Sequence, residues 1–156
     1  MITHNRIKDF LFSIFVLLAF LKDFMDTTAL VEESFEHIKE NKEVFINSFY
    51  SNLFDLAPEV KPLFSNVDKI KQGEKLYNSL LLLVENLKNP ELLSDVLTSL
   101  GKDHISYGTQ LQHYPVVGEC LIQTFKSILK DNWDKETETA WLETYNVVVN
   151  LMTTKN

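Results

Sequence analysis

Breaks in the helical periodicity of the chain constrain its fold more than any other feature. The sequence holds only four glycines and four prolines, and each proline lies at the start of an apolar-periodic segment or in a corner between two. Apolar residues recur at spacings of three and four, as in Phe45, Phe49 and Leu53, which is the period of one face of an α-helix. The pattern lacks strand-like alternation and the turn residues that a β-sandwich or β-barrel needs. The sequence therefore predicts an all-α protein.

Side chains that can cap helices indicate where several of the predicted helices begin. Thr28 is expected to cap the first one, because a hydroxyl oxygen can accept a hydrogen bond from the free N–H groups of a first turn. Asn89, followed by Pro90 at the first helical position, and Asp134 are expected to cap two later helices. These signals divide the chain into six or seven helices.

An up-and-down four-helix bundle is the alternative all-α architecture. Such bundles join helices of similar length through short loops. The proline-containing corner that ends at Phe64 disfavours a bundle. So does the expectation that the helix closing near His104 is shorter than the helices on either side of it.

Composition bounds the class of protein. The chain has 156 residues, of which 45% are hydrophobic and 24% charged, as expected of one globular domain. Its net charge of −7 argues against non-specific binding to nucleic acid or to anionic membranes. Cys120 is the only cysteine, so an internal disulfide and a thiolate metal cluster are both excluded. A single cysteine is simplest to explain if the protein works in a reducing compartment, and we therefore expect it to be cytoplasmic.

The amino-terminal stretch, residues 1–24, is expected to stand apart from a domain formed by residues 25–156. Residues 10–21 are apolar except for Ser13, and as a helix they would span about 18 Å, short of a bilayer's hydrocarbon core of about 30 Å. This stretch is either an anchor to a membrane or a partner, a helical extension packed on the domain, or an untranslated segment before a true start at Met25. We favour the last interpretation.

Six motifs occur in the order and spacing of a globin. The chain most resembles single-domain bacterial globins and the haem domain of flavohaemoglobins, over about residues 27–152. This resemblance implies a globin fold of six to eight helices around a haem pocket, with haem b as the cofactor. The motifs are FYSNLF (49–54), PEVKPLF (58–64), QGEKL (72–76), LGKDHISYG (100–108), HYPVVGECL (113–121) and AWLETY (140–145).

The resemblance assigns the proximal position, where the protein ligates the haem iron, to His104. A lone histidine can serve there because the porphyrin supplies four nitrogen ligands and the protein need add only one. His113 is the competing histidine, nine residues later at the start of the next helix. By the same resemblance, Phe64 packs on the porphyrin, which gains contact area and orientation from an aromatic plane.

On the distal side, where a gas would bind, the resemblance places Tyr50 and Gln72. Both side chains can donate hydrogen bonds, and a bound dioxygen carries partial negative charge on its outer atom. Two donors in a dry pocket predict high dioxygen affinity and slow release. Leu76 lies one turn after Gln72, over the iron, and Lys75 is expected to reach a haem propionate or to compete for the distal pocket.

The remaining haem contacts implied by the resemblance are Tyr107 and Tyr114. In flavohaemoglobins a tyrosine ten residues after the proximal histidine joins a late glutamate to make that histidine more basic. Tyr114 occupies the tyrosine position, but the glutamate position falls on Asn156. The missing carboxylate weakens the expectation of efficient oxygen chemistry.

The leading hypothesis is a haem globin that binds dioxygen reversibly, as a carrier or store, and is not an enzyme. The alternatives are a nitric oxide dioxygenase, or a gas-sensing or interaction module. Because no flavin domain follows, the enzyme would need an external reductase. Expected partners are dioxygen, nitric oxide or carbon monoxide, with no nucleic acid, and a membrane only if residues 10–21 form an anchor.

Overall fold

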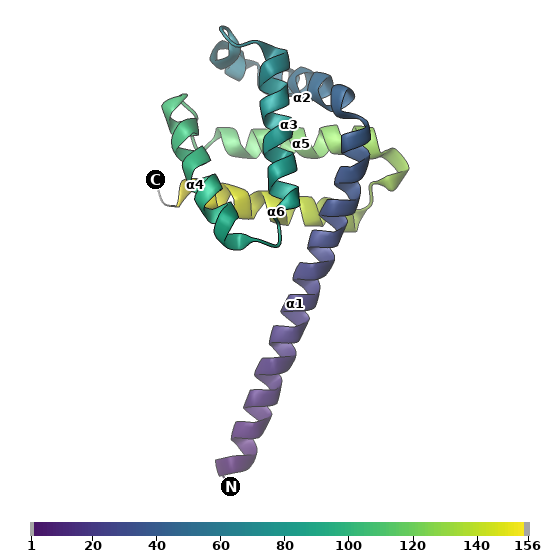
Figure 1. Ribbon diagram of the computed structural model, residues 1–156, viewed down its shortest axis with the longest axis vertical. Helices are drawn as coiled ribbons and strands as arrows, with labels where there is room; N and C mark the ends of the chain where they lie inside the picture. The colour runs from purple at the N-terminus through teal and green to yellow at the C-terminus, as the bar shows by residue number, and fades with distance from the viewer. Residues whose placement is uncertain (1, 155–156) are drawn as a thin grey trace.

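The computed structural model describes the backbone of residues 2–154 and the side chains of residues 11–154. Within this part of the chain no strand occurs, which confirms the all-α prediction (Figure 1). The α-helices are α1 (Ile2–Glu40), α2 (Lys42–Leu56), α3 (Lys69–Glu85), α4 (Pro90–Ser106), α5 (His113–Leu129) and α6 (Lys135–Thr153), and two short 3-10 helices are η1 (Pro58–Phe64) and η2 (Lys130–Asn132).

The helices cross one another in layers. Helix α2 packs on α5 and on α3, while α6 packs on α1, α4 and α5 (Figure 1). Helices α3, α4 and α5 have 17 residues each, so the expectation of a shorter helix ending near His104 was wrong. The crossing arrangement itself separates this fold from an up-and-down bundle.

Two apolar clusters hold the helices together. The larger is built from aromatic rings that α1, α2, α5 and α6 bury completely or almost completely, among them Phe35, Phe45, Phe125 and Trp141. The smaller lies beneath α4 and consists of Leu83, Leu93, Leu97, Tyr114 and Met152. This second cluster fixes α4 on α5 and α6 and so positions the helix that carries His104.

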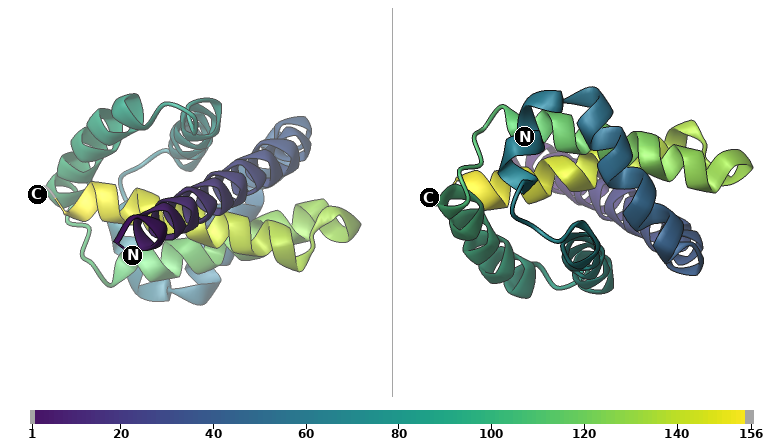
Figure 2. Two further views of the ribbon diagram at one scale, coloured as in Figure 1. Left: turned by 90° about the horizontal axis from the view of Figure 1, so that it is seen from below. Right: turned by 90° about the horizontal axis from the view of Figure 1, so that it is seen from above.

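Helices α3 and α4 meet near the loop that joins them and diverge away from it (Figures 1 and 2). Leu83, near the end of α3, and Leu93, near the start of α4, belong to one apolar cluster. Gln72 lies in the first turn of α3 and His104 in the last turn of α4. Both residues therefore lie toward the diverging ends of the two helices.

Helix α1 continues unbroken through the position where a helix start was expected. Thr28 does not cap it: the Thr28 hydroxyl donates to the carbonyl of Phe24 at 2.9 Å, a bond typical of threonine inside a helix. The apolar residues before Thr28 continue the helix, so the cap prediction was wrong. The predicted boundary at residue 25 and the predicted start at Met25 stay predictions.

The amino-terminal half of α1 extends away from the rest of the molecule (Figure 1). Residues 11–26 are all exposed, so the structure does not show the packing on the domain that was one interpretation of this stretch. None of the helices, over the residues described, has the length and apolar character needed to cross a membrane.

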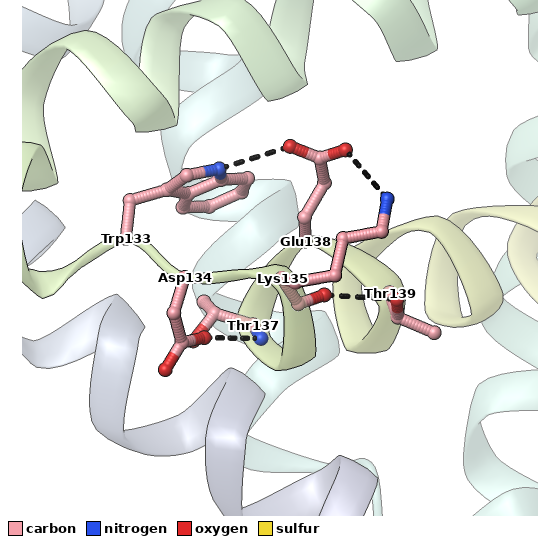
Figure 3. A network of polar contacts seen from close by, with 6 residues as sticks. All are labelled: Trp133, Asp134, Lys135, Thr137, Glu138 and Thr139. Carbon is pink, nitrogen blue, oxygen red and sulfur yellow. Dashed lines mark hydrogen bonds and ion pairs between the residues drawn. The ribbon is translucent and has the colours of Figure 1, made fainter.

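The two later cap predictions are confirmed. The Asn89 side chain accepts from the N–H of Leu92 at 3.2 Å. Asp134 accepts from the N–H of Thr137 at 2.7 Å. Hydrogen bonding to the backbone and side chain of Thr137 lowers the pKa of Asp134. Figure 3 shows this start of α6, where Glu138 also accepts from the Trp133 indole at 3.1 Å. Helix α6 is thus fixed at one end before it reaches Tyr145.

Candidate functional site

The ring of His104 has a defined orientation at the end of α4. Its Nδ1 lies 2.8 Å from the carbonyl oxygen of Leu100, one turn earlier. Because a carbonyl can only accept, Nδ1 carries the proton, and the lone pair of the neutral ring lies on Nε2. A backbone carbonyl holding one ring nitrogen while the other is available is the usual arrangement of a metal-ligating histidine. His104 is half-buried, so Nε2 is not enclosed by the core.

A glycine four residues after His104 marks where the chain turns away from α4. Gly108 adopts φ 84°, a left-handed conformation that glycine takes without strain. The turn lets the N–H of Thr109 donate to the carbonyl of His104 at 3.0 Å. The tyrosine-glycine pair at 107–108 therefore fixes where the chain leaves the site.

His113 is engaged differently. Its Nδ1 accepts a hydrogen bond from the N–H of Gln110 at 3.1 Å, so the proton of the neutral ring lies on Nε2. That tautomer has no lone pair left for a metal. Of the two histidines in this region, His104 presents a lone pair on Nε2, whereas the lone pair of His113 is engaged by the N–H of Gln110.

Tyr114 packs beside the His104 ring. The two ring centroids are 6.2 Å apart with an interplanar angle of 23°. The Tyr114 carbonyl accepts a hydrogen bond of 2.6 Å from the Tyr145 hydroxyl of α6. A Cβ atom on Gly118 would lie 2.5 Å from the Tyr145 ring, so the glycine allows this close approach of α5 and α6.

On the other side, a second glycine determines how α2 and α3 cross. A Cβ atom on Gly73 would overlap the Ile46 side chain, and Gly73 is buried. Gln72 immediately precedes this crossing point, and Tyr50 lies one turn after Ile46 on α2. The two predicted distal residues thus lie on the two crossing helices, but of the two only Tyr50 lines the hollow between α2, η1 and the start of α3.

The structure brings Tyr50 and Phe64 together. Their rings meet edge to face with centroids 5.6 Å apart, and Phe54 packs on both. All three line a hollow of about 700 Å³ between α2, η1 and the start of α3. Burial raises the pKa of Tyr50 to about 12, so its hydroxyl stays protonated near neutral pH. Among residues 11–154 the hydroxyl has no hydrogen-bond partner, so it is a free donor.

The other predicted contacts are more dispersed. Leu76 is half-buried against the larger apolar cluster and Gln72 is half-buried, whereas Lys75 is exposed and Tyr107 is 71% exposed. Asn156, the position of the missing carboxylate, lies outside the described residues. In the described part of the chain, no three His, Cys, Asp or Glu side chains are grouped as a metal site would require.

Sequence reasoning missed four contributors to this site: the Leu100 carbonyl, the Tyr145 hydroxyl, Gly73 and Gly118. The first had a signal, because a residue four positions before His104 on a helix presents its carbonyl to that side chain. The other three depend on contacts between helices distant in the chain. The residue types of Tyr145, Gly73 and Gly118 do not by themselves indicate which distant helix each one contacts.

The comparisons with known proteins point to one family. Residues 47–152 match the family model described as Globin. A leghemoglobin from Lupinus luteus is 32% identical over 76% of this chain and 85% of its own length. A solved bacterial globin from Campylobacter jejuni is 28% identical with a TM-score of 0.70, covering 81% of this chain and 91% of that one.

Flavohemoproteins are also similar. The one from Rhizobium meliloti is 29% identical over 84% of this chain, but the chain spans only 32% of its length. An engineered carbene transferase from Rhodothermus marinus, described as a candidate nitric oxide dioxygenase, is 28% identical with a TM-score of 0.74, over 83% of this chain and 90% of that one. The family match covers most of the chain and agrees with the crossing helices described above. The chain belongs to the globin family.

Proposed function

We propose that this globin holds haem through His104 and binds dioxygen reversibly. The observation that carries the proposal is the Nδ1 contact of His104 with the Leu100 carbonyl, which leaves Nε2 as a ligand. Haem iron would supply the coordination position at which a gas binds. The donor set therefore fits the group, since a porphyrin needs only one ligand from the protein.

The haem would be bound without a covalent link, as in haem b. Thioether attachment needs accessible cysteines, and Cys120, the only cysteine in the sequence, is fully buried. Its thiol contacts the carbonyl of Phe49 at 3.3 Å, within the apolar core. Phe64 and Tyr107 would then contact the macrocycle, with Leu76 on the distal side, and Lys75 is exposed enough to approach a propionate.

Tyr50 and Gln72 would set the dioxygen affinity. The Tyr50 hydroxyl is protonated and free, and it lies beside Phe64, the predicted haem contact. It would donate to dioxygen together with the Gln72 amide. Each such hydrogen bond is worth about 1–3 kcal/mol and slows dissociation roughly ten- to a hundredfold.

Absorption spectroscopy tests the proposal. The chain reconstituted with haem should show a Soret band that shifts on reduction and on addition of carbon monoxide or dioxygen. His104→Ala should lose the normal band, whereas His113→Ala should keep it because its ring is engaged with Gln110. A colourless wild-type chain, or equal loss in both variants, would contradict haem ligation by His104.

Nitric oxide dioxygenase activity with an external reductase is the second candidate. The similarity to flavohemoproteins favours it, as does the free Tyr50 donor. Against it, the Tyr114 hydroxyl has no carboxylate partner among the described residues, and burial alone raises its pKa. Nitrate formed per haem with a supplied reductase separates the two: repeated turnover indicates the enzyme, and a single equivalent indicates the reversible binder.

A further inference from the structure

Residues 11–21 of α1 form an apolar extension outside the globin domain. Ser13 is its only polar residue, and its large side chains are exposed: Leu11 by 58%, Phe12 by 69%, Phe15 by 68% and Phe20 by 67%. The extension lies on a helix that projects from the folded body (Figure 1). So much exposed apolar surface on one element indicates an interaction site.

The distribution of apolar residues around the helix identifies what covers it. Successive helical residues point about 100° apart, so the five consecutive apolar residues of 14–18 cover every direction around the axis. A protein partner, or a second copy in a coiled coil, covers one stripe and leaves the rest in water. The extension is also only about one and a half heptads long, too short for a stable coiled coil. A helix that is apolar on every side is instead suited to the hydrocarbon of a lipid bilayer, which surrounds it completely.

The length of the extension and the charged residues on either side of it are also consistent with insertion into lipid. Eleven residues of helix span roughly 16 Å, too short to cross a hydrocarbon core of about 30 Å, so the extension would stay within one leaflet. In the sequence, Arg6 and Lys8 precede the extension and Lys22 follows it, so a helix that lies along the leaflet, and not straight down into it, keeps both charged ends near the phosphate headgroups. The whole chain carries −7, so apolar burial and not charge would drive the contact.

We propose that the apolar extension inserts into the hydrocarbon of one leaflet of a lipid bilayer and holds the globin domain at the membrane surface. The helix continues without a break from the extension into the packed part of α1. Insertion would therefore fix the orientation of the domain relative to the membrane. This inference is independent of gas binding.

Flotation of the full chain with phosphatidylcholine vesicles tests it. The chain should float with neutral vesicles and remain bound in high salt. The double variant Phe15→Glu/Leu18→Glu should bind about a hundredfold more weakly, because carboxylates are strongly disfavoured in hydrocarbon. The matched control is Leu142→Glu/Val147→Glu, which adds the same charge at exposed positions of α6 and should float like the unchanged chain.

A second readout does not depend on added charge. In Leu18→Trp the new indole should be quenched by brominated lipid more strongly than the two native tryptophans of the unchanged chain. Equal flotation of the two double variants, binding only to anionic vesicles with release by salt, or concentration-dependent self-association without vesicle binding would each overturn the proposal. Circular dichroism checks that every variant keeps its helices.

Discussion

At the scale of single residues, hydrogen-bond chemistry distinguishes groups of the same type. His104, in the last turn of α4, and His113, at the start of α5, differ in whether Nδ1 faces an acceptor or a donor, and that difference fixes which nitrogen can bind a metal. Tyr50 and Tyr77 also have different surroundings. Both are buried, but only Tyr50 lines the hollow beside Phe64. Position within the fold, and not residue type, therefore determines which tyrosine can donate to a ligand.

We expect Tyr50→Phe to release dioxygen faster, by roughly ten- to a hundredfold, because one donor to the ligand is lost. Gln72→Leu should act in the same direction. Stopped-flow dissociation of dioxygen from the reduced haem form measures both rates. Tyr77→Phe is the control, since its ring packs on Phe35 in the core and should leave the rate unchanged. Unchanged rates in Tyr50→Phe and Gln72→Leu would remove the distal assignment.

Tyr145→Phe should destabilise the protein by about 1–3 kcal/mol, because the carbonyl of Tyr114 loses its donor in a largely buried place. Urea unfolding measures this free energy. Tyr77→Phe again serves as the control: it removes the same atom from a buried ring, but no hydrogen bond to another group is recorded for its hydroxyl within residues 11–154. Equal costs for the two variants would show that the Tyr145 bond contributes nothing specific.

At the scale of helices, two glycines allow the close crossings that shape both sides of the site. Gly73 lets α3 approach α2 at Ile46, and Gly118 lets α5 approach the Tyr145 ring of α6. In an exposed helix a glycine costs about 1 kcal/mol relative to alanine. Both glycines are buried, so the packing they allow offsets that cost.

Replacing a glycine inside a helix by alanine usually stabilises a protein. Gly73→Ala should instead destabilise this one by about 1–3 kcal/mol, because the new methyl group overlaps Ile46. Denaturant unfolding of the single variants and of Gly73→Ala/Ile46→Ala forms a double-mutant cycle. We expect a favourable coupling in the double variant, which removes the overlapping atoms. Asn78→Ala, at an exposed position of α3, is the control; additive effects would contradict the crossing described here.

Helix starts show what could be read from the sequence. Asn89 and Asp134 were predicted as caps because a cap contacts only the next turn. Thr28 has the same chemistry, yet its hydroxyl turns back to Phe24 because the preceding residues are also helical. The crossings at Gly73 and Gly118 could not be predicted, since they depend on side chains 27 residues away in each case.

At the scale of the whole molecule, apolar periodicity was sufficient for the fold class and for the order of the helices. It was not sufficient for the site, because His104 and Gln72 are placed by the divergence of α3 and α4, which no local pattern encodes (Figure 2). The roles of these residues came from the resemblance to globins and stay predictions until haem binding is measured. What the fold adds is a physical reason for choosing His104 over His113.

Burial of ionisable groups across the core predicts how stability depends on pH. Burial raises the pKa of Tyr50 from 10.0 to about 12 and that of Cys120 from 9.0 to about 12, and it raises the pKa of Tyr145 as well. The unfolded chain therefore loses these protons at lower pH than the folded chain does. The contribution of these groups to stability should be constant below about pH 9 and should fall as the pH rises toward 12.

The contribution of Tyr50 can be isolated. At pH 11, one unit above the unfolded pKa of Tyr50, its share of the lost stability is about 1.4 kcal/mol. Urea unfolding at pH 8 and pH 11 should therefore show a loss smaller by that amount in Tyr50→Phe than in the unchanged chain. Tyr107→Phe, which alters a ring that is 71% exposed, should leave the loss unchanged. If Tyr50→Phe does not reduce the loss, burial in the folded state does not raise the pKa of Tyr50.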